Sequence, residues 1–180
     1  LVPRPRGTVA AWRESLVASM YTGLLGQRLD EMSQRAATPF AFAFAGAGSL
    51  TPTRDAFTAA AVVKEGKFTE SLEATLGELE RANRFGFSTT EFERQKVSYI
   101  RSLERAVAEA DKVESRNVAG QLVSFALDHG TLSSPAQLQS LASAYLGGIA
   151  LAEVNAAARA WMPAGNRTIS VAAPARPDVV

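Results

Sequence analysis

The 180-residue sequence contains no cysteine and only one histidine, His129. The absence of cysteine excludes disulfides, thiol nucleophiles and cysteine-ligated zinc from these residues. Protein zinc sites normally combine several ligands, among which Cys and His predominate. A lone histidine therefore predicts that this chain holds no metal and no cofactor by itself.

Long apolar runs and an imbalance of charge are also missing. No stretch approaches the roughly 20 apolar residues that a membrane span needs, so none is expected. Lys and Arg number 19 and Asp and Glu 18, which gives no indication of nucleic acid as a partner. Residues 1–12 carry Pro and Arg where a signal peptide would have its apolar core. The hydrophobic fraction of 47% still suffices for one folded domain.

Residues 8–35 predict a long helix. Thr8 is a suitable N-cap, and Pro39 ends the segment because the residue before a proline is pushed towards an extended conformation. Apolar residues recur at helical spacing along one stripe: Trp12, Leu16, Met20, Leu24 and Met32.

The stretch FAFAFAGAG begins at Phe40 and alternates Phe with Ala, the period of a β-strand. A second strand is predicted within residues 55–66, so the two segments form an antiparallel hairpin. Phe40, Phe42 and Phe44 are predicted to line one face, either as core or as the lining of a peptide or ligand groove. The glycines lead into a strand, whereas a phosphate-binding loop opens into a helix.

Helical patterns follow from Lys67 onwards. Gly86 suits the end of the first of these helices, and Ser88 with Glu91 forms the capping box of the next. In the first helix Phe68, Leu72, Leu76 and Leu79 form the apolar stripe and Glu78 lies off it. Further helices are predicted from about 92 to 107, at 115–127, near 135–146 and near 151–162, and a last strand at 166–174.

This order predicts an α+β fold, with an antiparallel-dominated sheet and several helices packed on one face. Residues 1–180 are interpreted as one domain, with a linker at 1–7 and a tail at 175–180.

No self-contained active site is predicted, and no residue is assigned a catalytic role. His129 follows Asp128, but neighbours in sequence rarely adopt the geometry of a catalytic triad, and a helix end is the favoured interpretation. The remaining charged cluster is interpreted as a solvated helix face with ion pairs: Arg101 and Arg105 with Glu104 and Glu109.

Four segments together resemble the C-terminal-type domain of the insulinase/pitrilysin-like zinc peptidases, a family that includes the mitochondrial processing peptidases. They cover nearly the whole chain: LVASMYTGLLGQRLDEMSQ, TPFAFAFAG, the stretch from RDAFTAAAVVKEG to RQKVSYIRSLE, and LAEVNAAARAWMPAGNRTISVAAP. The resemblance implies a processing-peptidase-like metallohydrolase domain. The family usually has a strand just upstream of the position of LVPRPRG, residues 1–7, so the chain is interpreted as excised from a longer multi-domain peptidase.

The family's zinc motif, His-x-x-Glu-His with a distant Glu, lies in another domain and is not matched here. Enzymes of this family consist of two similar halves. In the domain of the second half that corresponds to this chain, an Arg and a Tyr seven residues later help to hold the substrate backbone. Arg35 falls at the Arg position, but Phe42 lacks the tyrosine hydroxyl. This difference favours assignment of the domain to the zinc-bearing half of the enzyme. The alternative is that the Arg–Tyr contact with the substrate is not made in this protein. Arg35, Phe40, Phe42 and Phe44 remain the candidates for contact with the substrate chamber. A second departure is Ala150, where a capping Thr is usual.

The resemblance implies a supporting, non-catalytic domain of a zinc metalloendopeptidase that encloses and hydrolyses peptides. Its partners would be the zinc-bearing domain of the same parent, which carries the zinc, and a peptide substrate. A homodimer of the isolated chain, through faces left uncovered, is a further expectation. Resemblance to bacterial members implies a periplasmic or envelope location. The alternative is an inactive family member that acts as a peptide-binding scaffold or partner subunit.

Overall fold

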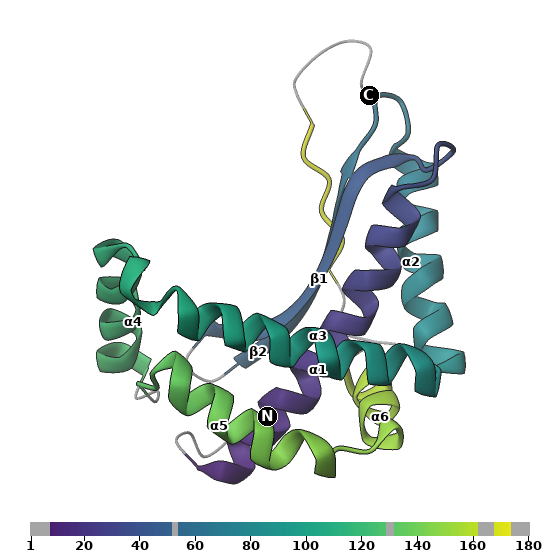
Figure 1. Ribbon diagram of the computed structural model, residues 1–180. Helices are drawn as coiled ribbons and strands as arrows, with labels where there is room; N and C mark the ends of the chain where they lie inside the picture. Colours follow the sequence, from purple (N-terminus) through teal and green to yellow (C-terminus); the bar gives the residue numbers. More distant parts are fainter. Residues whose placement is uncertain (1–7, 52–53, 129–131, 162–167, 174–180) are drawn as a thin grey trace.

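The computed structural model describes residues 8–51, 54–128, 132–161 and 168–173 and has the predicted α+β fold (Figure 1). A two-stranded antiparallel sheet in these ranges is covered by helices on one face. The elements run in the following order: α1 (Val9–Ser33), β1 (Phe40–Thr51), β2 (Arg54–Val63), α2 (Phe68–Phe85), α3 (Thr89–Ala108), a 3-10 turn η1 (Ala110–Lys112), α4 (Ser115–Asp128), α5 (Pro135–Tyr145), a 3-10 turn η2 (Leu146–Gly148) and α6 (Leu151–Trp161).

Helix α1 forms the centre of the molecule. The Thr8 hydroxyl accepts a hydrogen bond from the backbone N–H of Ala11 at 3.1 Å, which confirms the predicted N-cap. Six residues of α1 are almost fully buried: Leu16, Met20, Tyr21, Leu24, Leu25 and Leu29. The Tyr21 ring contacts Phe57 of β2 and Phe87 of the α2–α3 turn, with centroids 5.6 and 6.0 Å apart. One helix thereby anchors both the hairpin and the turn.

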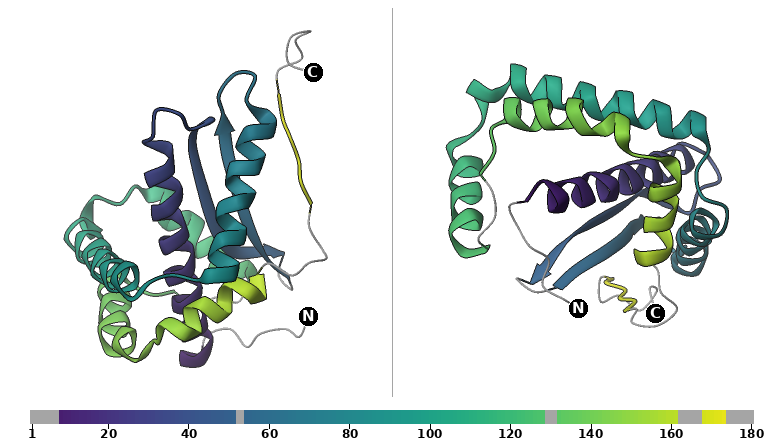
Figure 2. Two further views of the ribbon diagram at one scale, coloured as in Figure 1. Left: turned by 90° about the vertical axis from the view of Figure 1, so that its right-hand side faces the viewer. Right: turned by 90° about the horizontal axis from the view of Figure 1, so that it is seen from below.

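The predicted hairpin is confirmed, with β1 antiparallel to β2. Helices α1 and α2 lie together on one face of it (Figure 2, left). Small side chains allow this close approach, since Ala43 pairs with Ala61 and Ala45 with Ala59, and all four pack at or against the core. The hairpin is thus a sheet with one covered face and one open face.

The α2–α3 connection forms as predicted. Gly86 follows α2 with φ of +70°, a conformation that glycine adopts without strain. Both hydrogen bonds of the predicted capping box are present, since Ser88 Oγ accepts from the Glu91 N–H at 3.3 Å and the Ser88 N–H donates to Glu91 Oε2 at 2.7 Å.

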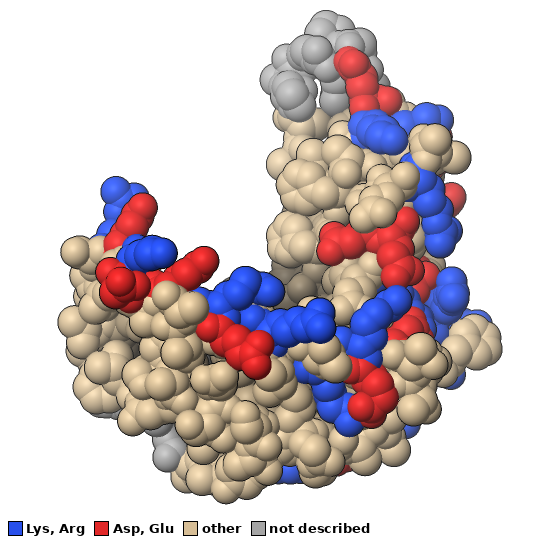
Figure 3. All heavy atoms as spheres, in the orientation of Figure 1, with Lys and Arg blue, Asp and Glu red and all other residues tan. Residues whose placement is uncertain are grey.

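Helices α3 and α5 run side by side as an outer layer over α1 (Figure 2, right). Helix α4 projects from this layer, and residues 115–127 are all exposed. A hollow separates the arm that holds the hairpin from the arm that ends in α4, and basic side chains gather over α3 at its foot (Figure 3).

Two sequence predictions need correction. The last strand, predicted at 166–174, is not formed by the described residues 168–173, which are exposed and carry no strand. The alternating pattern of this segment favours an extended chain, but a strand also needs a neighbouring edge with free hydrogen-bonding groups. Residues 166, 167 and 174, the linker 1–7 and the tail 175–180 lie outside the described residues.

The second correction concerns α2. Leu72 of the predicted stripe is 38% exposed, whereas Ser71, Thr75 and Glu78 face inward. The apolar pattern therefore placed the buried face of α2 slightly wrongly. Ser71 is satisfied because its hydroxyl donates to the Pro39 carbonyl at 2.9 Å, a contact that also ties α2 to the start of the hairpin.

No single helix in the described ranges is long and apolar enough to cross a membrane. The segments Pro135–Gly148 and Leu151–Trp161 reach that length and composition only when taken together across a bend of 102°.

Candidate peptide-facing surface

The open face of the hairpin exposes aromatic side chains. Phe42 and Phe44 each keep 51% of their surface exposed. Their pairing partners on β2 are Val62 and Ala60, so the same face carries apolar residues from both strands. Adjacent apolar side chains on an uncovered sheet face are typical of a surface that contacts another polypeptide.

Phe40 does not belong to this row, so the prediction that the three phenylalanines share one face is wrong. Phe40 pairs with Val63 while Phe42 pairs with Val62, which marks an irregularity of one residue at Ala41. A bulge of this kind turns the side chains before it to the opposite face. Phe40 is consequently fully buried in the core, and its ring is not accessible to a ligand.

Arg35 lies in the exposed connection between α1 and β1. Its N–H donates to the Met32 carbonyl at 3.0 Å, and its own carbonyl accepts from the Thr38 N–H at 3.1 Å. These backbone bonds hold the turn that leads into the hairpin. The guanidinium itself has no ion-pair partner among the described residues, so it remains available to an acceptor.

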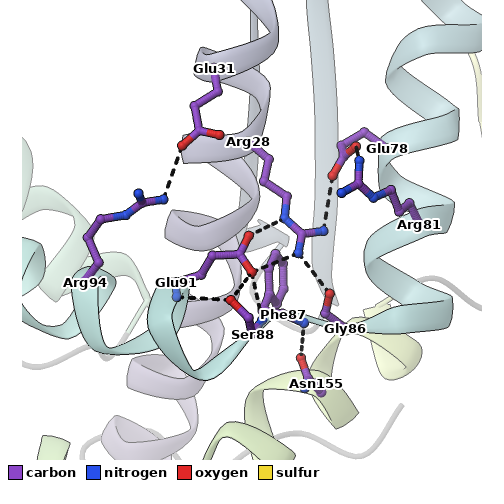
Figure 4. Close-up of polar contacts among 10 residues, drawn as sticks. All are labelled: Arg28, Glu31, Glu78, Arg81, Gly86, Phe87, Ser88, Glu91, Arg94 and Asn155. Atoms are coloured by element: carbon purple, nitrogen blue, oxygen red, sulfur yellow. Dashed lines mark hydrogen bonds and ion pairs between the residues drawn. The ribbon is translucent and has the colours of Figure 1, made fainter.

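A charged junction fixes α1, and with it the hairpin, against the neighbouring helices (Figure 4). Arg28 of α1 donates from Nε to Glu91 Oε1 at 2.7 Å and from Nη2 to Glu91 Oε2 at 3.1 Å. The same guanidinium donates to Glu78 of α2 at 3.2 Å and to the Gly86 carbonyl at 3.0 Å. Its carbon lies 4.5 Å from the centre of the Phe87 ring, a cation–π contact.

The junction perturbs the ionisation of its members. Hydrogen bonds from Arg28 lower the pKa of Glu91 from 4.5 to about 2, against the opposing effect of burial. Burial alone would lower the pKa of Arg28, but its hydrogen bonds to Glu91 and its charge interactions with Glu91 and Glu78 raise it above the ordinary value. Both groups therefore remain charged at neutral pH.

Helix α6 is joined to the α2–α3 turn and to the start of α1 by two polar contacts. The Asn155 side-chain oxygen accepts from the Phe87 N–H at 2.9 Å, beside Gly86. Arg13 donates to both oxygens of Glu153, at 2.7 and 2.9 Å. Glu153 also accepts from the Ala150 N–H at 2.9 Å, which is one of the two hydrogen bonds of a capping box, while Ala150 has no side-chain oxygen to accept the other.

No pattern in the sequence indicates the Arg28 junction. The capping box identified Glu91, but no local pattern indicates that an arginine 63 residues earlier binds it. Glu78 lies off the predicted apolar stripe, yet only 7% of its side chain is exposed, and its carboxylate pairs with Arg28 and Arg81. The junction positions the hairpin and carries no reactive group of its own.

The described residues contain no cluster of three His, Asp or Glu side chains that could hold a metal, and the sequence has no Cys. His129 and the interpretation attached to it lie outside the described residues. The open face of the hairpin presents an apolar surface, and Arg35 lies in the exposed turn before the hairpin.

No protein-family model matches this sequence. No curated protein is significantly similar to it in sequence.

Solved structures with a similar fold include the following three. The periplasmic protease PqqL from Escherichia coli superposes with a TM-score of 0.78 and 19% identity over 89% of this chain. The structure of the first half of PqqL gives 0.77 and 19% over 89%. A predicted insulinase-family protease from Yersinia pestis gives 0.74 and 16% over 92%. The fold is therefore that of insulinase-family proteases.

The chain spans only part of each of these proteins. It covers 18% of PqqL, 35% of the PqqL half and 38% of the Yersinia pestis protein.

Proposed function

We propose that this chain is a non-catalytic supporting domain of a zinc-dependent metalloendopeptidase. In this proposal it packs against the zinc-bearing domain of the same parent protein and supplies part of the wall of a peptide-enclosing chamber. The observation that carries the proposal is the apolar open face of the hairpin, in a fold shared with insulinase-family proteases. The zinc and its hydrolytic chemistry belong to the other domain.

Phe42 and Phe44 are the residues of this chain assigned to the peptide. Burial of apolar side chains of a substrate against two half-exposed rings is favourable by about 25 cal/mol per Å² removed from water. Arg35, in the turn before the same hairpin, is assigned to donate to a peptide carbonyl. Phe40 is assigned a positioning role only, because its ring lies in the core.

The proposal is tested in the longer polypeptide that carries this segment, with the isolated chain beside it. Zinc content and cleavage of a fluorogenic peptide are measured for both. We expect zinc and cleavage in the longer polypeptide and neither in the isolated chain. Zinc-dependent cleavage by the isolated chain would overturn the proposal.

The role of the hairpin face is tested by the double variant Phe42→Ala and Phe44→Ala in the longer polypeptide. We expect KM to rise while kcat and the zinc content stay unchanged. The two rings contact the bound peptide equally in the substrate complex and in the transition state, so their loss weakens binding alone. Phe85→Ala is the matched control, since Phe85 is 81% exposed at the end of α2, away from the hairpin. An equal effect of both changes would count against the assigned face.

Absence of zinc and cleavage from the longer polypeptide would instead favour the alternative, an inactive member that binds peptides as a scaffold or partner subunit. Peptide binding that still depends on Phe42 and Phe44 would then identify the scaffold.

The proposal places the parent in the periplasm or cell envelope of a bacterium, as PqqL is a periplasmic protease.

The proposal also includes self-association of the isolated chain as a homodimer, because helix α4 exposes the apolar residues Val118, Leu122 and Phe125 at helical spacing. Light scattering over a range of concentrations measures this, and a strictly monomeric chain would exclude it.

A further inference from the structure

We propose that the groove between α1 and α3 binds an extended acidic segment of polypeptide, whose carboxylate is held by Arg101 and Arg105. The groove has a volume of about 770 Å³ and is open to solvent. It lies between the central helix and the outer helix layer and uses no residue of the hairpin. The proposal therefore stands independently of the proposed function.

The spacing of the basic residues produces a single basic wall. Arg94, Arg101 and Arg105 are separated by seven and four positions, so they lie on one face of α3 and all line the groove. Arg101 and Arg105 are on successive turns, close enough for both guanidinium groups to approach one carboxylate. Two planar forks of N–H donors are well suited to carboxylate oxygens.

The charges at one end of the groove are already paired. Arg94 Nη2 lies 3.2 Å from Glu31 Oε1 on α1, and Glu93 Oε1 lies 2.7 Å from Lys96 Nζ. Arg101 and Arg105 have no ion-pair partner among the described residues. The predicted pairing of these arginines with Glu104 and Glu109 is not formed, although all four side chains are exposed. The other end of the groove thus retains two free cations.

The remaining lining favours a peptide over a polyanion. Val97 is 51% exposed and lies between the arginines along α3, where it offers an apolar contact. Asp30 lies on the opposite wall, where its carboxylate can accept a backbone N–H. A nucleic acid would bring phosphates close to Asp30, Glu31 and Glu93, and like charges repel. A peptide can place its carboxylate at the basic end and its neutral backbone beside the acidic wall.

The probe is a fluorescein-labelled peptide of ten residues in which Glu alternates with Ala, and fluorescence anisotropy gives its Kd. The test variant is Arg101→Gln with Arg105→Gln. The matched control is Arg116→Gln with Arg159→Gln, which changes the net charge equally at two exposed sites outside the groove. A peptide in which Gln alternates with Ala tests the need for carboxylates.

We expect the test variant to weaken binding of the acidic peptide by about tenfold or more, as the loss of a charge-assisted contact predicts. The control variant should keep its Kd within about twofold, and added salt should weaken binding to the unchanged protein. The variant Arg101→Lys with Arg105→Lys, which keeps the charge without the planar forks, should bind with intermediate affinity.

Three results would overturn the proposal. The first is an equal loss of affinity in the test and control variants, which would indicate unspecific electrostatics. The second is equal affinity for the acidic and the Gln-containing peptides. The third is tighter binding of a single-stranded oligonucleotide than of the acidic peptide. Both arginines are exposed, and circular dichroism checks that the variants remain folded.

Discussion

Arg28 of α1 and Glu91 of α3 form a two-point contact, with Nε 2.7 Å from one carboxylate oxygen and Nη2 3.1 Å from the other. Parallel N–H donors on two oxygens fix the relative orientation of the groups as well as their distance. Because the same guanidinium reaches Glu78 and the Gly86 carbonyl, one side chain joins α1, α2, α3 and the turn between the last two.

Replacing Arg28 by Met should lower the free energy of unfolding by about 3 kcal/mol, because a largely buried ion pair loses one partner. The Arg28 side chain is 14% exposed. Arg94→Met is the control, since the Arg94–Glu31 pair is exposed and should cost less than about 1 kcal/mol. Urea unfolding measures both. Similar losses in the two variants would contradict a structural role specific to the junction.

The acid stability of the protein should depend on Glu91. Its pKa is about 2 in the folded protein against an ordinary 4.5, so the unfolded chain binds a proton first as the pH falls. The stability from this group is present above pH 4.5 and lost between 4.5 and about 2, and amounts to about 2 kcal/mol after allowance for partial solvent exposure.

Unfolding measured from pH 7 to pH 2 tests this expectation. Glu91→Gln should reduce the slope in that window, while the amide oxygen can still accept from the Ser88 N–H. Glu70→Gln is the control, because Glu70 and its partner Lys67 are both about half exposed, at 48% and 53%. An unchanged slope in Glu91→Gln would argue against the contact with Arg28.

The two faces of β1 should respond differently to the same substitution. Phe40→Ala removes a fully buried ring and should cost about 3–5 kcal/mol of stability. Phe42→Ala, two residues later, removes a half-exposed ring and should cost less than about 1 kcal/mol. Thermal unfolding of the two variants provides the comparison. Equal costs would mean that the bulge between them does not separate the faces.

Gly86 and Gly66 offer a matched test of backbone strain and close contact. Both have φ of +70°, where alanine is strained by about 1–2 kcal/mol, and Gly86 also has ψ of −158°, a combination that is essentially confined to glycine. A Cβ at Gly86 would also lie 2.6 Å from Asn155 Cγ, whereas at Gly66 it meets nothing within 4 Å.

Gly86→Ala should therefore destabilise the protein more than Gly66→Ala, and Asn155→Ala should recover part of the difference by removing the clash. Denaturant midpoints measure all three. Equal midpoints for the two glycine variants would show that Asn155 yields without cost.

Local chemistry made most of the elements predictable from the sequence. Thr8, and Ser88 with Glu91, mark helix starts through bonds that span three residues, and the alternation from Phe40 onwards marks a strand. Interactions of this range depend on neighbours along the chain, so the sequence records them directly.

The candidate surface could be predicted only in part. The Phe-Ala alternation identified the right strand, but one irregularity at Ala41 decided which rings are buried and which are exposed. Period-two reasoning assumes a continuous register and cannot detect an extra residue. The groove was missed because its walls come from helices that are distant in sequence.

The sequence by itself determined the α+β class, the order of the helices, the caps at Thr8 and Ser88, and the absence of cysteine chemistry. Only the tertiary structure decided that Glu78 is buried, that Arg28 joins three helices, and that Arg101 and Arg105 lack their local partners. The reason is physical. Backbone hydrogen bonds and periodicity are short-range, whereas burial and ion pairing depend on which distant surfaces meet when the chain packs.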